Sequence, residues 1–374
     1  MTLTLEELAR YSRHLSLGEF GHTGQEKLKA ARVLVVGAGG LGSPALLYLA
    51  AAGIGTIGIV DFDRVDISNL QRQVLFNTSQ VGHFKAEAAS VNLQALNPLL
   101  NIVTHTQALR VDNVMEIVRD YDVVLDGTDR FTTRYLVNDA CVLLKKSLVS
   151  AAIHRFEGQA FTYVPQRGPC YRCLFPQPPA NGAVPNCAET GVLGVLPGVM
   201  GTLQATEVIK LITGIGEPLL GRLLTYDAID MRFAEFNFTA REDCAVCGMQ
   251  PSISAPNDMA VLCIDAPSTV QPISTVELHE LISTTHTGWQ LIDVRESFEF
   301  AAGHIDGAIH IPLSALLDES ATFDTSVRLI FVCRSGGRSA QACTWAATRG
   351  TAAQSLQGGL LAWKKVIDPN IIVA

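Results

Sequence analysis

Two short cysteine pairs, Cys170/Cys173 and Cys244/Cys247, stand out among the nine cysteines of this 374-residue chain. A Cys-x-x-Cys turn offers two thiolates to one ion, and zinc favours four such ligands in a tetrahedron. A redox role would need only one pair, so it is the weaker alternative. Since no further cysteine or histidine stands beside either pair, the spacing predicts one closed, structural zinc site.

A different chemistry is indicated by a glycine- and arginine-containing turn, Cys333-Arg334-Ser335-Gly336-Gly337-Arg338. Backbone N–H groups of such a turn and the N-terminus of a following helix stabilise a thiolate, and the two arginines add positive charge. A cysteine phosphatase would need an arginine six positions after the cysteine, where this chain has Ser339. The smaller turn suits a sulfur atom better than a phosphate, so we expect a nucleophilic Cys333.

A glycine-rich segment with the G-x-G-x-x-G pattern comprises Gly37-Ala38-Gly39-Gly40-Leu41-Gly42. Its glycines allow a tight turn and close approach of the backbone, and a following helix favours an anionic phosphate. Asp61 ends the next apolar segment, where an acidic residue accepts hydrogen bonds from ribose hydroxyls. The motif alone usually marks a dinucleotide-binding oxidoreductase.

The residues that follow argue for a triphosphate instead. Asn69, Arg72 and Lys85 supply an amide and two cations, which suit a polyphosphate chain. Asp126 and Asp129 follow another apolar segment, and a carboxylate beside a triphosphate suits Mg²⁺. An NAD(P)-dependent oxidoreductase leaves the amide and the two cations unexplained.

These residues need a scaffold, and the sequence predicts one of the α/β class. A strand at 32–36, a helix at 43–52 and a strand at 56–60 imply a parallel, Rossmann-like doubly wound sheet. Further helices are expected at 80–96 and 191–213. The segment 147–164 continues the sheet, and a strand at 122–125 precedes Asp126.

The composition changes after Cys247, which predicts a linker over 251–271 between domains 1–250 and 272–374. In the second domain, a strand over 328–333 leads directly into the Cys333 turn and a helix follows it, so a smaller α/β unit is expected.

Composition excludes several classes of protein. With 28 Lys+Arg and 36 Asp+Glu the net charge is −8, which disfavours nucleic acid as a partner. No apolar run reaches the roughly 18–20 residues of a membrane span. The acidic, helical N-terminus is unlike a signal peptide, and the odd cysteine count argues against a disulfide framework. We therefore expect a cytoplasmic protein with no membrane partner.

The ordered set of motifs over residues 5–250 resembles the MoeB/ThiF-type adenylyltransferases of the ubiquitin-activating-enzyme family. The resemblance implies ATP as the nucleotide, bound over the glycine-rich turn, and a homodimer. It also implies that the four cysteines of the two pairs hold Zn²⁺. The implied ATP-binding residues are Gly39, Gly40 and Gly42 of the turn, Asp61 for the ribose, Asn69, Arg72 and Lys85 for the phosphates, Asp129 for Mg²⁺, and Arg13 for the partner subunit's phosphates.

Residues 272–370 resemble a rhodanese domain. The resemblance rests on Asp293-Val294-Arg295-Glu296, on the segment from Gly303 to Ala308 and on the Cys333 turn. It implies a persulfide on Cys333. Asp293 and Arg295 are expected to support the loop, and His304 to be structural.

Together the resemblances imply an enzyme that adenylates the C-terminal glycine of a ubiquitin-like sulfur-carrier protein and then forms a thiocarboxylate. The carrier would serve a molybdenum-cofactor, thiamine or other thio-transfer route, and a cysteine desulfurase or thiosulfate would donate the sulfur. Catalytic roles fall to Arg72, Lys85, Cys333 and Cys187, the last of which could attack the activated or sulfurated carrier or be an incidental loop cysteine. A scaffold that binds ATP and persulfide without turnover is the non-enzymatic alternative.

Overall fold

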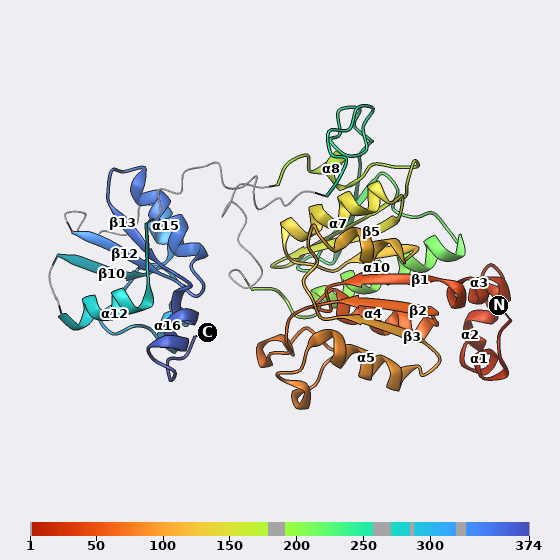
Figure 1. The fold of residues 1–374 in the computed structure, drawn as a ribbon, viewed down its shortest axis with the longest axis horizontal. Coiled ribbons are helices and arrows are strands. Elements are labelled where there is room, and N and C mark those ends of the chain that lie inside the picture. The colour runs from red at the N-terminus through yellow and green to blue at the C-terminus, as the bar shows by residue number, and fades with distance from the viewer. Residues whose placement is uncertain (1, 179–190, 257–270, 285–287, 319–326, 374) are drawn as a thin grey trace. The chain divides into compact units, whose positions relative to one another are not determined.

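The computed structural model describes residues 2–178, 191–256, 271–284, 288–318 and 327–373. The described residues up to 256 form one compact unit and those from 271 onward form another (Figure 1). Each unit has its own sheet and its own hydrophobic core, so each is described separately below.

The first unit is built on an eight-stranded sheet with the order β3-β2-β1-β4-β5-β6-β7-β8. The strands from β3 to β5 are parallel, and β6, β7 and β8 extend the sheet in antiparallel fashion. Its strands are β1 (Arg32–Val36), β2 (Thr56–Val60), β3 (Asn101–His105), β4 (Val123–Asp126), β5 (Ser147–His154), β6 (Glu157–Tyr163), β7 (Arg222–Asp227) and β8 (Arg232–Asn237). Its helices are α1 (Leu5–Arg10), α2 (Ser12–Leu15), α3 (Gly21–Ala30), α4 (Gly42–Ala52), α5 (Lys85–Leu96), α6 (Val114–Arg119), α7 (Phe131–Leu143), α8 (Tyr171–Leu174) and α10 (Leu196–Thr213), with 3₁₀ turns at Ile67–Asn69 and Thr78–Gln80.

After Arg32, strand β1 is apolar because helices cover both faces of the parallel sheet. Val33 and Val35 belong to a core shared with α3, α4, α5 and α10. Leu34 and Val36 point the other way, into a core shared with α6 and α7. Figure 1 shows α7 and α5 on opposite sides of these strands. This arrangement confirms the doubly wound α/β class and places the carboxyl ends of β1, β2 and β4 side by side.

The antiparallel half of the sheet was not predicted from the sequence. Strands β5 and β6 are joined through Arg155 and Phe156 alone, and a parallel pairing would need a crossover of a dozen residues or more. Arg155 adopts a positive φ of 53° in this turn. The short connection therefore fixes the reversal of strand direction.

The second unit has a five-stranded parallel sheet with the order β11-β10-β12-β13-β9. In β12, Ile330 and Val332 belong to one core, while Leu329, Phe331 and the following Cys333 belong to the core on the other face. The elements are β9 (Gln271–Ile273), α12 (Thr275–Thr284), β10 (Trp289–Asp293), α13 (Ser297–Ala302), β11 (Ile309–His310), α14 (Leu313–Leu317), β12 (Arg328–Val332), α15 (Gly337–Ala347), β13 (Ala353–Leu356) and α16 (Gly359–Val366).

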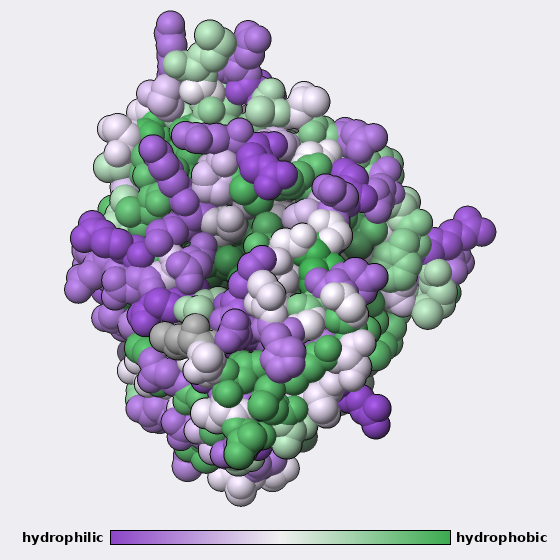
Figure 2. Space-filling model, turned by 90° about the vertical axis from the view of Figure 1, so that its right-hand side faces the viewer, coloured by the Kyte–Doolittle hydropathy of each residue, from purple (hydrophilic) through white to green (hydrophobic). Residues whose placement is uncertain are grey.

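The expected strands at 32–36 and 56–60 agree with β1 and β2, whereas two helices are shorter than expected. The helix expected at 80–96 begins at Lys85, and the helix expected at 191–213 begins at Leu196 with a proline in its first turn. Hydrophilic and hydrophobic residues are intermixed over the face drawn in Figure 2. Within the described residues, no helix has both the length and the apolar character that a membrane crossing requires.

Candidate functional site

The glycine-rich turn connects β1 to α4 and has little room for side chains. Gly37 has a φ of +90°, a conformation that favours glycine. A Cβ at Gly42 would collide with the carbonyl oxygen of Gly37, so the turn can close only with glycine there. At Gly40 a Cβ would lie 3.1 Å from Pro197 of α10. The backbone of Gly39 is open by comparison, which leaves it accessible to a phosphate.

Asp61 follows β2 and holds the start of the glycine-rich turn. One carboxylate oxygen accepts a hydrogen bond from the backbone N–H of Ala38 at 2.8 Å, and the other accepts one from Asp63 at 2.9 Å. Burial raises the pKa of Asp61, although the positive charge of Lys85 and these two hydrogen bonds act in the opposite direction. The predicted ribose-binding carboxylate is therefore adjacent to the turn, as the sequence implied.

The two predicted phosphate-binding cations lie near the same turn. Lys85 is the first residue of α5, is buried, and its Nζ lies 3.3 Å from a carboxylate oxygen of Asp63. Arg72 packs over the turn, since a Cβ at Gly40 would lie 3.7 Å from its Cδ. One guanidinium N–H of Arg72 donates to the carbonyl oxygen of Ser68 at 3.1 Å. The cations are thus brought together by β2, the loop after it and the start of α5.

The two aspartates after β4 have different surroundings. Asp126 is fully buried and accepts hydrogen bonds from Ser150 at 2.9 Å and Arg134 at 3.3 Å, so it fixes the end of the strand. Asp129 is exposed, which leaves its carboxylate free to meet a metal ion. Asn69 is half-buried, and its side-chain oxygen accepts a hydrogen bond from the backbone of Asp66 at 3.4 Å.

Two predicted site residues are not assembled with the others in the described chain. Arg13 is exposed on α2. Cys187 lies outside the described residues.

Gln73 is a candidate that the sequence did not single out for a role. It is buried, and a Cβ at Gly39 would lie 3.7 Å from its side-chain nitrogen. Its Oε1 has no hydrogen-bond partner within the described residues. Its place immediately after Arg72 was the available signal, but a glutamine at a single position does not by itself indicate a ligand.

The four paired cysteines converge in space. From Cys170 Sγ the distances to the Sγ atoms of Cys173, Cys244 and Cys247 are 4.0, 3.7 and 3.4 Å. All four sulfur atoms lie within 4.8 Å of one another, and four thiolates around one zinc ion are about 3.8 Å apart. The donor set and its spacing therefore fit a tetrahedral metal site.

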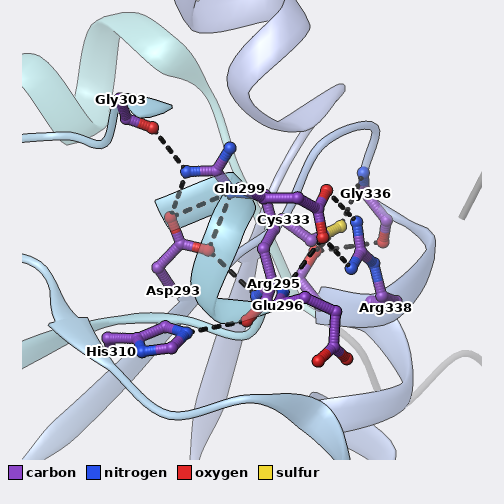
Figure 3. Close-up of polar contacts among 10 residues, drawn as sticks. Asp293, Arg295, Glu296, Glu299, Gly303, His310, Cys333, Gly336 and Arg338 are labelled. Atoms are coloured by element: carbon purple, nitrogen blue, oxygen red, sulfur yellow. Dashed lines mark hydrogen bonds and ion pairs between the residues drawn. The ribbon is translucent and has the colours of Figure 1, made fainter. Parts of the chain in front are cut away.

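The Cys333 loop joins β12 to α15 in the second unit (Figure 3). The sulfur atom accepts a hydrogen bond from the backbone N–H of Gly336 at 3.1 Å and lies 3.5 Å from the hydroxyl oxygen of Ser339. Gly336 has a φ of +105°, which favours glycine at the residue that precedes α15. The loop therefore provides the anion-stabilising surroundings expected for a nucleophilic thiolate. Cys343 is the second cysteine among the described residues of this unit and lies on α15. Burial raises the pKa of its thiol to about 12, so this thiol stays neutral.

Buried ion pairs support this loop. Arg295 pairs with Asp293 at 2.8 Å and also donates to the carbonyl oxygen of Gly303, so this pair fixes the segment that follows β10. Arg338 pairs in bidentate fashion with Glu299, at 2.6 and 2.7 Å (Figure 3). Glu299 was missed at the sequence level because a glutamate in a helix usually faces solvent.

His304, expected to be structural, is exposed and makes local contacts with α13. Its ring stacks on Phe300 with 3.8 Å between centroids, and its Nδ1 lies 3.0 Å from the carbonyl oxygen of the same residue. His310 lies against Phe300 as well, at 4.6 Å between centroids. The contacts of His304 with Phe300 thus hold the turn that follows α13 against that helix.

The Glu299–Arg338 pair predicts an acid-sensitive second unit. Burial opposes the charge of Glu299, but the hydrogen bonds and positive charge of Arg338 outweigh it and hold the pKa of Glu299 below its usual value. A lowered pKa gives stability that is complete above the unfolded-state pKa and is lost as pH falls through the folded-state pKa. We therefore expect the unfolding free energy of the wild-type protein to be larger than that of Glu299→Gln. The difference should be constant above about pH 4.5 and should shrink as the pH falls below that value.

Tryptophan fluorescence measures this difference selectively, because the three tryptophans, Trp289, Trp345 and Trp363, all lie in the second unit. Urea unfolding at several pH values from 7 to 3 gives the comparison. A difference between wild type and Glu299→Gln that does not change with pH would count against the ion pair.

Comparison with known proteins finds one family match in each of the two units. Residues 11–246 match the model of the ThiF family. The chain belongs to the ThiF family. Residues 274–366 match the rhodanese-like domain, so the two family matches are separate and successive along the chain.

The relatives with both parts match over nearly the whole chain. A probable adenylyltransferase/sulfurtransferase MoeZ of Mycobacterium tuberculosis is 45% identical, over 99% of this chain and 96% of that protein. An adenylyltransferase and sulfurtransferase MOCS3 of Drosophila yakuba is 41% identical, over 98% of this chain and 85% of that protein. A sulfur carrier protein adenylyltransferase of Thermus thermophilus is 52% identical, over 70% of this chain and 99% of that protein.

Among solved structures, E. coli MccB in a crystal structure with ATP has a TM-score of 0.57 and 26% identity, covering 64% of this chain and 73% of that chain. This ThiF-family chain is therefore an adenylyltransferase and sulfurtransferase, and the oxidoreductase alternative receives no support from these relatives.

Proposed function

We propose that this enzyme adenylates the C-terminal glycine of a ubiquitin-like sulfur-carrier protein and converts the terminal carboxylate into a thiocarboxylate. The observation that carries the proposal is the presence, in one chain, of a cation-lined glycine-rich turn and a cysteine loop with an anion-stabilising N–H. A protein named as a sulfur carrier protein adenylyltransferase is 52% identical, which supports the same class of substrate.

In the first step the carrier's carboxylate attacks the α-phosphate of ATP, and pyrophosphate leaves with its electron pair. The nucleophile is already anionic, so no general base is required. Arg72 and Lys85 neutralise the phosphate charge, Asn69 donates to it, and Asp61 orients the ribose. Asp129 would hold a Mg²⁺ ion, which supplies charge neutralisation at the polyphosphate when bound.

In the second step a persulfide on Cys333 attacks the carbonyl carbon of the acyl-adenylate and displaces AMP. The product is an acyl disulfide between the carrier and Cys333. Attack of the Cys187 thiolate on Cys333 Sγ would release the thiocarboxylate and leave a Cys187–Cys333 disulfide, which a cellular thiol then reduces. An external thiol could replace Cys187 in this release. Placing both activities in one chain raises the effective concentration of the persulfide.

The domain assignments are part of this proposal. We assign adenylation to residues 1–250, a connecting segment to 251–271 and sulfur transfer to 272–374. The family matches over 11–246 and 274–366 support this division. A homodimer in which Arg13 reaches the partner's nucleotide completes the adenylation site. The sulfur donor is a cysteine desulfurase or thiosulfate.

We assign Zn²⁺ to the four-cysteine cluster, where it would link α8 to the turn around Cys244 and have no part in catalysis. Helix α8 is anchored to α7 by a bidentate ion pair between Arg172 and Asp139, with both N–O distances at 2.7 Å. The cluster therefore ties the C-terminal end of the first unit to its core.

Cys247→Ser is expected to lose the zinc and to destabilise the first unit by several kcal/mol, since zinc binding and folding are coupled at such sites. Elemental analysis and calorimetry measure the two effects. Cys141→Ala removes a buried thiol from the same unit and should keep one zinc per chain. A Cys247→Ser protein with unchanged metal content and melting temperature would refute the assignment.

Carrier-dependent exchange of labelled pyrophosphate into ATP tests the proposed function. We expect exchange with a ubiquitin-like carrier that ends in glycine, and none with a carrier that lacks this residue. A scaffold without turnover would give no exchange with any carrier, and an oxidoreductase would instead consume a nicotinamide cofactor.

A further inference from the structure

Four buried residues of alternating charge lead to the Cys333 loop (Figure 3). Asp293 and Arg295 form the first pair, and Glu299 and Arg338 form the second. All four are at most 5% exposed, and the charge of Arg295 also acts on Glu299. Their two negative and two positive charges cancel, so these four side chains together add no net charge beside the loop.

The Glu299–Arg338 pair fixes the position of the loop. Glu299 Oε2 accepts hydrogen bonds from Arg338 at 2.6 Å and from the backbone N–H of Glu296 at 2.9 Å, and its Oε1 accepts the other N–H of Arg338 at 2.7 Å. Arg338 lies in the first turn of α15, two residues after Gly336, whose N–H donates to Cys333 Sγ. The pair therefore ties the start of α15 to α13.

Arg334 has different surroundings, although it belongs to the same loop. It is half-exposed, and its guanidinium makes no hydrogen bond or ion pair with any residue that the structure describes. Its backbone carbonyl accepts a hydrogen bond from Leu361 at 3.0 Å, so its position beside Cys333 is fixed while its side chain is free to reach solvent. Of the two loop arginines, only this one can offer an uncompensated charge to an incoming anion.

We propose that Arg338 is a positioning residue that acts through Glu299 to hold the Gly336 N–H on the Cys333 sulfur, and that Arg334 is the residue that selects an anionic sulfur donor. This inference rests on the proposed role of Cys333 as sulfur acceptor. It divides two arginines that the sequence presents as equivalent into one structural support and one recognition residue.

Alkylation of Cys333 in the full-length protein separates the two roles without any sulfur transfer. Iodoacetamide is neutral and iodoacetate is anionic, and peptide mass spectrometry follows Cys333 alone among the nine cysteines. A recognition cation accelerates the anionic reagent selectively. A positioning residue affects both reagents equally, because it acts on the reactivity of the sulfur itself, and it shifts the pH profile of the reaction.

Glu299→Gln and Arg338→Gln should each slow both reagents by about tenfold and move the pH midpoint of alkylation upward. Because the two residues act as one unit, the double variant should be no slower than the slower single variant. Arg334→Gln should lower the iodoacetate rate by about threefold or more while leaving the iodoacetamide rate and the pH midpoint unchanged. Lys365→Gln removes an equal charge from exposed α16 and should change neither rate.

Tryptophan fluorescence of each variant establishes that the second unit is folded before rates are compared. Arg338→Lys keeps the charge but loses the bidentate geometry, so it should behave like Arg338→Gln. The inference is overturned if Arg338→Gln slows iodoacetate alone, if Glu299→Gln accelerates iodoacetate by freeing Arg338, or if Arg334→Gln has no selective effect. Loss of carrier-dependent exchange would challenge the proposed function but would leave these rates unaffected.

Discussion

Cys333→Ala is expected to abolish formation of the carrier thiocarboxylate while leaving adenylation of the carrier nearly unchanged. The persulfide cannot form without the Cys333 sulfur atom, which accepts the hydrogen bond from the Gly336 N–H. The acyl-adenylate forms at the glycine-rich turn of the other unit, before any sulfur is needed. With ATP and a persulfide donor, the carrier should therefore accumulate as its adenylate, which intact-protein mass spectrometry detects after a single turnover.

Cys343→Ala is the matched control for this experiment. Cys343 lies on α15 in the same unit, and its buried, neutral thiol has no place in the proposed relay. The Cys343→Ala enzyme should therefore still form the carrier thiocarboxylate. Cys187→Ala should keep both adenylation and the Cys333 persulfide, with any defect confined to release of the sulfurated carrier. Thiocarboxylate formed by Cys333→Ala at the wild-type rate would exclude the rhodanese domain as the relay.

Lys85→Ala, Arg72→Ala and Asp129→Ala are each expected to reduce carrier-dependent ATP–pyrophosphate exchange by about 100- to 1,000-fold. The first two remove positive charge beside the glycine-rich turn, and the third removes the proposed Mg²⁺ ligand. Lys85 is buried against Asp63, so its loss also leaves that carboxylate without its partner. Exchange is measured with labelled pyrophosphate at saturating carrier.

Arg119→Ala serves as the control, since it removes a positive charge from the exposed end of α6. It should exchange at the wild-type rate. Calorimetry of the three site variants separates a loss of chemistry from a loss of folding, and Cys333 persulfide formation should persist in all of them. Exchange at the wild-type rate in the three variants would reject the assigned nucleotide site.

Sequence patterns predicted the parallel part of the first unit well because its signals are local. The apolar runs of β1 and β2 and the glycines between β1 and α4 are contiguous in the chain, and burial on both faces requires such runs. The antiparallel strands β7 and β8 gave no comparable signal, since every residue of β8 is exposed. The pairing of β7 with β8 depends on the short turn over 228–231 that joins them and not on an apolar pattern.

The residues of the candidate sites also differ in whether a local sequence signal identifies them. Residues in contiguous motifs, such as the cysteine pairs and the Cys333 loop, could be named from spacing alone. Glu299 could not, because its role depends on Arg338, a residue 39 positions away that only the fold brings within hydrogen-bonding distance. Gln73 was missed for a related reason, since its burial beside the glycine-rich turn is a property of packing.

The central claim is that one chain both activates a carrier's C-terminus and delivers sulfur to it. The most direct measurement follows a heavy sulfur isotope from the Cys333 persulfide to the carrier in a single turnover with ATP, read by mass spectrometry. We predict that the isotope replaces one terminal carboxylate oxygen of the carrier, with release of one AMP and one pyrophosphate. A carrier that stays unlabelled while the persulfide on Cys333 remains intact in the presence of ATP would contradict the account.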